Sequence, residues 1–493
     1  MILGDPDTTV AGATLDELFR RAGVRAPDAV ALIDPPNKES FADGAPRKLT
    51  FAEADRLISN VAARLRALGL HADAIVALQL PNTVESVIAL LGVLRAGMIA
   101  APLPFLWRQR EIVAALRGVG VKAIITHGAT LARSATLAAV ELFPIRHVCA
   151  FGRGLPDGVV PLDDLFADRA PDSVDAAARS GPAAAHLALM TFDVTADGFV
   201  PVARNHLQLT AGGLAVFLEA GLAQQASILS MIPPASFASV ALTLLPWLLA
   251  GGTLALHHGG DTDVLAAQIA ERADSTLILP GPALSPLAEA GRLGVEKIVA
   301  LWRAPERLAA DTAWRGEATL VDVASFGEIG LLASRRGAAG LPVPLPLGQV
   351  TAPRGGAGAV VETSRSHSGT LALRGLMVPA HAFPPGAAQA AEPDGFRDTG
   401  FTCRLDHDGL IVTGPPGGLA TVGGYRFHQQ EIEAELATID PAATLVALPH
   451  GMLGHRLAGS APDRQAMVAA LQARGANPLL THAFRPRRAA DAA

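Results

Sequence analysis

The chain has 493 residues, of which half are hydrophobic and 17% are charged, and its formal net charge at pH 7 is −6. This length exceeds what one hydrophobic core usually fills, so it predicts two or more domains. The weak negative charge gives no electrostatic reason to expect nucleic acid as a partner. The two cysteines, Cys149 and Cys403, lie far apart in the sequence and form no CxxC pair. They indicate neither a disulfide framework nor a zinc site, and a cytoplasmic location is expected.

Residues 49–126 alternate between helical and strand patterns. The segment LTFAEADRLISNVAARLRALGL carries apolar residues at helical spacing and ends at Gly69, a residue typical of helix C-termini. Strand AIVALQL, helix VESVIALLGVLRAG, strand MIAAPL, helix EIVAALRGVG and strand VKAIIT follow in order. Strands that alternate with helices predict a largely parallel, doubly wound sheet.

Residues 186–206 form the stretch where an α/β protein would place a phosphate site. Apolar residues 187–192 predict a strand, residues 193–198 a polar turn and residues 199–202 a second strand, before a helix that Asn205 would cap. Loop N–H groups converge at such a position and bind phosphate oxygens.

The composition of this turn argues against phosphate binding. A triphosphate site needs glycines, hydroxyl donors and a lysine, whereas the turn offers one glycine, Gly198, one hydroxyl, Thr195, and no lysine. Its carboxylates, Asp193 and Asp197, would each repel a phosphate charge by about 3 kcal/mol at roughly 5 Å. An acid-containing surface turn is therefore the alternative interpretation.

Residues 236–260 form the longest uncharged stretch, long enough to suggest a membrane span. Pro246 and the pair Gly251-Gly252 are expected to divide it into a helix and a strand, TLALHH, so we expect a buried α/β unit and no membrane span. The two histidines at the end of that strand, His257 and His258, are interpreted as surface residues.

Several motifs resemble those of the adenylate-forming superfamily, which includes acyl-CoA synthetases and nonribosomal-peptide adenylation domains. LTFAEA, ALQLPN and LRAGMIAAPLP stand in the family's order and spacing, and the resemblance runs from about Leu15 to about Leu436. It implies a large N-terminal domain of doubly wound sheets with a small barrel-like subdomain, residues 1–414, and a shortened α+β C-terminal domain, residues 415–493.

The same resemblance implies where an ATP site would lie. In the family, the stretch that corresponds to residues 186–206 reads close to Thr-Ser-Gly-Thr-Thr-Gly-x-Pro-Lys-Gly, and His206 stands where the family has a histidine. Thr195 is the retained hydroxyl, while Val200 or a neighbour stands in place of the lysine. Trp302 and Arg303 replace two glycines that form one wall of the adenine pocket.

Later motifs depart from the family in a similar way. Glu328, which helps to hold magnesium in the family, is retained, but its neighbours, among them Ser325, differ. Phe401 stands in place of the aspartate that binds the ribose, and Pro415 and Pro416 follow Gly414, where the family has its hinge arginine. No lysine occurs after Lys297, so the family's late catalytic lysine is absent. Ser236 and Phe237 match a segment beside the acyl site and are the candidates for that pocket.

These motifs leave two hypotheses. The first is an active ligase that uses ATP, magnesium and CoA or a carrier protein to activate a carboxylic acid through an acyl-adenylate. The second is a pseudoenzyme that binds an acyl ligand or a partner without efficient adenylation. We favour the second, because five elements of one ATP site are altered together, and no cofactor is then required. The sequence identifies neither the acyl group nor the oligomeric state.

Overall fold

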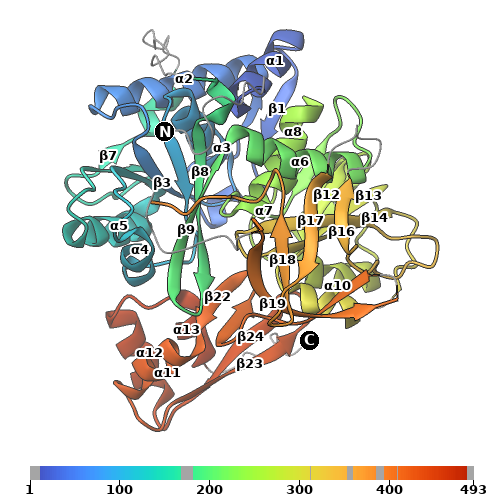
Figure 1. Ribbon diagram of the computed structural model, residues 1–493. Helices are drawn as coiled ribbons and strands as arrows, with labels where there is room; N and C mark the ends of the chain where they lie inside the picture. Colours follow the sequence, from blue (N-terminus) through green and yellow to red (C-terminus); the bar gives the residue numbers. More distant parts are fainter. Residues whose placement is uncertain are drawn as a thin grey trace.

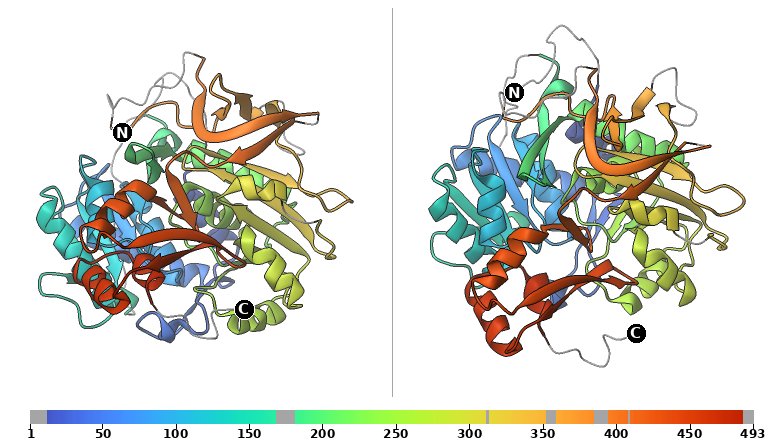
Figure 2. Two further views of the ribbon diagram at one scale, coloured as in Figure 1. Left: turned by 90° about the horizontal axis from the view of Figure 1, so that it is seen from below. Right: turned by 60° about the horizontal axis from the view of Figure 1, so that its bottom comes forward.

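The computed structural model describes residues 12–167, 181–310, 313–351, 359–384, 394–407 and 409–485. Two large sheets with helices packed against them form the body of the molecule (Figure 1). Figure 2 shows the C-terminal elements, in red, as a layer against one end of this body. The architecture confirms the predicted α/β class with doubly wound sheets.

The first large sheet has the strand order β7-β6-β5-β3-β4-β8-β9. All neighbouring pairs are parallel except β8 and β9, which form an antiparallel hairpin. Its strands are β3 (Ile75–Gln79), β4 (Ile99–Pro102), β5 (Ala123–His127), β6 (His147–Phe151), β7 (Val160–Pro161), β8 (Leu187–Thr195) and β9 (Gly198–Asn205). The associated helices are α2 (Phe51–Ala67), α3 (Val84–Arg95), α4 (Gln109–Leu116) and α5 (Gly128–Glu141).

The second large sheet has the order β15-β14-β13-β12-β10-β11-β1-β2, with antiparallel pairing only at its two ends. Its strands are β1 (Val30–Ile33), β2 (Lys48–Thr50), β10 (Ile228–Ser230), β11 (Leu254–Leu256), β12 (Thr276–Pro280), β13 (Lys297–Trp302), β14 (Thr319–Phe326) and β15 (Gly330–Arg335). Its helices are α1 (Leu15–Arg25), α6 (His206–Glu219), α7 (Phe237–Ser239), α8 (Leu245–Ala250), α9 (Thr262–Glu271) and α10 (Leu284–Glu289).

A five-stranded antiparallel sheet, β16 to β20, follows in the chain and corresponds to the barrel-like subdomain of the expectation. Its strands are β16 (Gly348–Thr351), β17 (Ala359–Arg365), β18 (Thr370–Arg374), β19 (Arg397–Asp406) and β20 (Gly409–Gly414). The C-terminal layer comprises β21 (Leu419–Val422), β22 (Tyr425–His428), α11 (Gln429–Ala437), β23 (Thr444–His450), β24 (Gly454–Ser460), α12 (Arg464–Ala473) and α13 (Pro478–Ala483).

The local patterns of residues 49–126 explain the elements that they form. Helix α2 begins with a capping box, in which Thr50 and Glu53 satisfy each other's backbone N–H groups. It ends before Gly69, whose φ of 78° is the left-handed conformation expected of a C-terminal glycine. Helix α3 is buried at every residue, and Gly92 allows it to approach α2 closely, because a Cβ there would lie 2.5 Å from Val61.

The uncharged stretch of residues 236–260 is a buried α/β unit, as expected. Pro246 does not divide it, however, because α7, a π-helical turn of residues Val240–Leu244 and α8 follow one another without a break, and the proline lies directly after the π-helical turn. The helical part ends instead at Gly251, which has a φ of 67°. Among the residues that the structure describes, no helix combines the length and hydrophobicity that crossing a bilayer requires.

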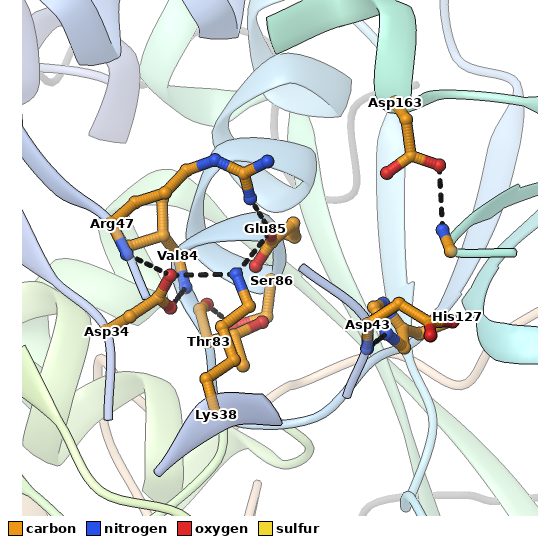
Figure 3. Close-up of polar contacts among 11 residues, drawn as sticks. Asp34, Lys38, Asp43, Arg47, Thr83, Val84, Glu85, Ser86, His127 and Asp163 are labelled. Carbon is orange, nitrogen blue, oxygen red and sulfur yellow. Dashed lines mark hydrogen bonds and ion pairs between the residues drawn. The ribbon is translucent and has the colours of Figure 1, made fainter. Parts of the chain in front are cut away.

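A buried ionic cluster joins the beginning of the second sheet to the first (Figure 3). The side chain of Lys38 is fully buried, and its Nζ lies 2.8 Å from Asp34 Oδ2 and 2.6 Å from Glu85 Oε1. Arg47 also donates to Glu85. Asp34 Oδ1 accepts a hydrogen bond of 2.7 Å from the N–H of Val84, the first residue of α3. The cluster therefore fixes where α3 begins.

Replacing Lys38 with methionine should destabilise the protein by about 3–5 kcal/mol, because two buried carboxylates lose the cation that they share. Urea unfolding measures this change in the free energy of unfolding. Lys48 is exposed on β2, so Lys48→Met is the matched control and should cost less than about 0.5 kcal/mol. Equal, small losses in both variants would contradict the role assigned to Lys38.

Candidate functional site

The β8–β9 hairpin occupies the position of the expected phosphate loop. The predicted turn over residues 193–198 is wrong in its bounds: β8 continues to Thr195, β9 begins at Gly198, and only residues 196 and 197 connect them. Asp193 pairs with Val200, and Thr195 with Gly198, in an unbroken antiparallel register. Alternate backbone N–H groups of this stretch are directed to the partner strand, and the others point away from it, so they do not converge on a phosphate.

The two acidic residues of the expected turn have different surroundings. Asp197 is exposed at the hairpin tip, where its N–H donates to Thr195 Oγ1. Asp193 is buried, which excludes the surface-turn interpretation for this residue, and its Oδ1 lies 3.1 Å from the guanidinium of Arg426 on β22. Burial raises the pKa of Asp193, and the Arg426 charge opposes this effect. This ion pair joins the hairpin to the C-terminal layer.

Glu328 lies next to this pair, in the turn between β14 and β15. A Cβ added to its neighbour Gly327 would lie 2.3 Å from a carboxylate oxygen of Asp193. Glu328 is buried, and its Oε2 accepts a hydrogen bond of 2.7 Å from the N–H of Phe237. Burial raises the pKa of Glu328, and the Arg303 charge is the largest opposing influence. The structure thus brings together two residues, Asp193 and Glu328, that are distant in the sequence.

Two arginines compensate the charge of these carboxylates. Arg303 donates to Ser236 Oγ at 2.7 Å and lies in the field of Glu328. Arg204, on β9, is fully buried and donates to the backbone carbonyls of Glu328 and Ile329. Burial lowers the pKa of Arg204 to about 9.

The ring of Phe237 lies under the guanidinium of Arg204, with 3.8 Å between the ring centroid and Cζ. Phe237 is fully buried, and a Cβ added to Gly212 would lie 2.6 Å from its ring. Of the two acyl-pocket candidates, Phe237 therefore packs in the core, while Ser236 accepts from Arg303 and caps α7.

The residues at the expected adenine and ribose positions are also packed into protein. Trp302 donates from Nε1 to Asp322 at 2.8 Å and covers Gly281, where a Cβ would lie 2.4 Å from its ring. Phe401 is buried and makes an edge-to-face contact with Phe326, with ring centroids 5.6 Å apart. Both rings are buried against protein, and Trp302 also lines the larger of the two hollows described below.

The remaining candidates take local structural roles. His206 begins α6, and its Nδ1 accepts a hydrogen bond of 3.2 Å from the N–H of Leu15. Thr195 Oγ1 bonds within the hairpin turn, and Ser325 Oγ donates to the Gly327 carbonyl. Pro415 and Pro416 lie between β20 and β21, and Pro416 packs against Gly400.

Two adjoining hollows remain around the cluster. The smaller, which we call the small cavity, measures about 60 Å³ and is bordered by Asp193, Ser236, Arg303, Glu328 and Arg426. Such a volume holds a few water molecules at most. The larger, which we call the large pocket, measures about 380 Å³ and lies between the body and the C-terminal layer. It falls within the range of small-molecule sites.

The large pocket is mostly apolar. Its lining comes from the loop after β4, the ends of β12 and β13, and two turns of the C-terminal layer, and it includes Phe105, Leu106, Ile232, Leu301, Met452 and Leu453. Arg303 and Tyr425 border both this pocket and the small cavity. Burial raises the pKa of Tyr425 to about 12, so its hydroxyl is neutral.

The sequence interpretation missed part of this pocket. His258 was expected at the surface, but it lines the large pocket, and His257 beside it is fully buried. The signal in the sequence was the position of both histidines at the end of an apolar strand. TLALHH leads directly from β11 into the space between the body and the C-terminal layer. Arg204 and Arg426 gave no local signal, since the groups that they contact come from distant parts of the chain.

The described residues do not fit a metal–nucleotide complex. They contain no group of three or more His, Cys, Asp or Glu residues placed to hold a metal ion. Glu328 accepts from Phe237 N–H and is surrounded by arginine charge, which disfavours a cation there. We therefore assign no step to magnesium or ATP in this site.

Comparisons with known proteins agree on the fold. The structure resembles the apo form of MbtA from Mycobacterium smegmatis, with a TM-score of 0.68 and 24% identity over 95% of this chain and 89% of that one. It also resembles the fused adenylation and carrier domains NpsA-ThdA from Klebsiella oxytoca, with a TM-score of 0.70 and 19% identity over 96% and 93% of the chains. These identities support a shared fold alone.

Sequence relatives match only parts of their length. Human long-chain fatty acid transport protein 1 is 30% identical over 156 residues, which are 32% of this chain and 23% of that protein. A beauvericin synthetase of Gibberella fujikuroi is 32% identical over 93 residues, which are 19% of this chain and 3% of the synthetase. The matches thus span less than a quarter of these relatives.

The family model described as AMP-binding enzyme matches residues 19–297, which is more than half of the chain. This region contains the first sheet, the β8–β9 hairpin and most of the second sheet. The chain belongs to the AMP-binding enzyme family, which confirms the resemblance to adenylate-forming enzymes.

Proposed function

We propose that this protein is a pseudoenzyme of the AMP-binding enzyme family that binds an acyl ligand without efficient adenylation. The observation that carries the proposal is the buried cluster of Asp193, Glu328, Arg204, Arg303 and Arg426. Asp193 and Glu328 stand in the segments that the family's motifs assign to the phosphate loop and the magnesium site, and the small cavity between them and the arginines measures only about 60 Å³.

Charge supports this proposal. A phosphate entering the small cavity would meet Asp193 and Glu328, while Arg426 is already paired with Asp193 and Arg204 already donates to backbone carbonyls. Adenylation needs preorganised positive charge around the α-phosphate and the reacting carboxylate. In this cluster two carboxylates already balance two of the three guanidinium charges before any substrate binds.

The large pocket supports the acyl-binding part of the proposal. An apolar cavity of about 380 Å³ with a cation at its border suits a ligand with an apolar body and a carboxylate. Arg303 is the cation shared with the small cavity, so the carboxylate would lie towards Arg303 and the apolar chain towards Leu301 and Phe105.

One observation favours the alternative, an active ligase dependent on ATP, magnesium and CoA or a carrier protein. Arg204 and Arg303 both act on Glu328, and released guanidinium groups would supply positive charge of the kind that the absent lysine supplies in the family. The alternative requires the cluster to open, which means that Asp193 and Glu328 must find other partners or a metal ion.

ATP–pyrophosphate exchange separates these two functions. With magnesium and a broad panel of carboxylic acids, we expect no exchange above a control without protein, because the carboxylates of Asp193 and Glu328 border the small cavity and would repel the phosphates. Thermal shift with ATP or AMP should likewise give no stabilisation. A ligand that binds the folded protein would, at 100 times its Kd, raise the free energy of unfolding by about 2.7 kcal/mol. Exchange above the control that is lost in Glu328→Ala would establish the ligase instead.

Acyl binding is tested by calorimetric titration with octanoate. We expect wild-type protein to bind it, and Arg303→Met to weaken binding by about tenfold or more, because a hydrogen bond to a charged group is lost. Arg404→Met, at an exposed position of β19, is the matched control and should bind as wild type does. Urea unfolding of each variant identifies a loss of binding that comes only from unfolding. No binding by wild-type protein would reject the acyl proposal.

A further inference from the structure

None of the polar side chains that line the large pocket is a carboxylate. No aspartate, glutamate, asparagine or glutamine lines the pocket, and its polar groups are those of His258, Arg303, Arg307, Thr421, Tyr425 and His455. Tyr425 accepts a hydrogen bond at its hydroxyl oxygen from the N–H of Leu106, so its own O–H remains a donor. A pocket without a carboxylate gives no compensation to a cationic ligand, and it suits a ligand that brings acceptors.

His258 is a donor whose tautomer is fixed by the backbone. Its Nδ1 accepts a hydrogen bond of 3.2 Å from the N–H of Asn82. A ring nitrogen that accepts carries no proton, so in the neutral ring the proton is on Nε2. Among the described residues nothing else is hydrogen-bonded to His258. Its Nε2–H is therefore available to a molecule in the large pocket.

Aromatic rings hold the imidazole in place. The ring of Phe41 lies 4.3 Å from that of His258, and the ring of Phe105, which also lines the pocket, makes an edge contact at 5.2 Å. Burial lowers the pKa of His258 to about 4, with a smaller effect from His257. The group is thus an uncharged donor over the physiological pH range.

The buried Lys38 cluster, which Figure 3 shows, anchors the segments that carry Phe41 and Asn82, two of the residues in contact with His258. Phe41 follows the short helix of residues Lys38–Ser40, and Lys38 anchors that helix to Asp34 and Glu85. Asp34 also accepts from Val84 N–H, two residues after Asn82. The amide of Asn82 is itself held, because its Nδ2 donates to the carbonyls of Ser230 and His257. The donor is therefore preorganised, and ligand binding need not order it.

We propose that His258 is a specificity-determining residue of the large pocket, whose Nε2–H binds an uncharged acceptor on the acyl chain. The ligand class is then an oxygenated acyl compound, such as an oxo acid, with its carboxylate towards Arg303 and a carbonyl oxygen towards His258. This inference rests on the proposed acyl-binding function and adds the chemistry of the chain.

Calorimetric titration with octanoate and with 4-, 5- and 6-oxooctanoate tests this specificity. We expect wild-type protein to bind at least one oxo acid about 3- to 10-fold more tightly than octanoate, the range of a single neutral hydrogen bond. In His258→Phe, which keeps an aromatic ring between Phe41 and Phe105, the ratio of the two affinities should fall to about one. His258→Gln, which retains an N–H donor, should keep part of the preference.

His367→Phe, at an exposed position of the turn between β17 and β18, is the matched control and should keep the full preference. The inference is overturned if wild-type protein binds octanoate and the oxo acids equally, or if His258→Phe keeps the wild-type preference. If wild-type protein binds none of the four acids, the acyl-binding function itself fails.

Nitrogen-15 NMR of the histidine side chains tests the donor without any ligand. The signal lost in His258→Phe should show an unprotonated Nδ1 and a protonated Nε2 at pH 7. A proton on Nδ1, or a doubly protonated ring, would overturn the assignment of His258 as a fixed Nε2–H donor. This result does not depend on acid binding, so it distinguishes failure of the inference from failure of the proposed function.

Discussion

The need to compensate buried charge governs the centre of this molecule. A carboxylate or guanidinium group that leaves water loses hydration energy, which only a close partner of opposite charge and good hydrogen bonds can offset. Asp193 and Glu328 meet this need through Arg426, Arg303 and Arg204, which come from three separate parts of the chain. The hairpin, the β14–β15 turn and the C-terminal layer are therefore linked by the same set of charges.

This set of charges also limits what the site can bind. In a binding site for ATP, the positive groups of the protein have no anionic partner until the phosphates of the ligand bind. Here the anions are part of the protein, so an incoming phosphate must compete with Asp193 for Arg426 and with Glu328 for Arg303. The large pocket is next to these groups but mostly apolar. An apolar ligand there would gain from apolar contact and would reach the cluster only at Arg303, which borders both hollows.

The sequence predicted those features whose causes are local. The helices and strands of residues 49–126 follow from apolar spacing, a capping box at Thr50 and a terminal glycine at Gly69. The β8–β9 hairpin was predicted with a longer turn, because polar Asp193 was assigned to the turn. In the structure Asp193 is part of β8 and pairs with Val200, and this pairing across the hairpin is not visible in the local pattern. The ion pair of Asp193 joins residues 233 positions apart. No window of sequence contains both partners, and the same holds for His258 and Asn82.

The fold and the nucleotide-binding motifs depend on different residues, which explains how the fold persists although these motifs are altered. The sheets are held by buried strands such as β3 and by a helix, α3, that is buried on every side. None of these contacts requires a lysine or a free carboxylate in the β8–β9 hairpin. Substitutions at the site therefore leave the core intact if each new buried charge finds a partner. Arg204, placed against Phe237 and the carbonyls of Glu328 and Ile329, has such partners, so this altered site is compatible with a stably folded protein.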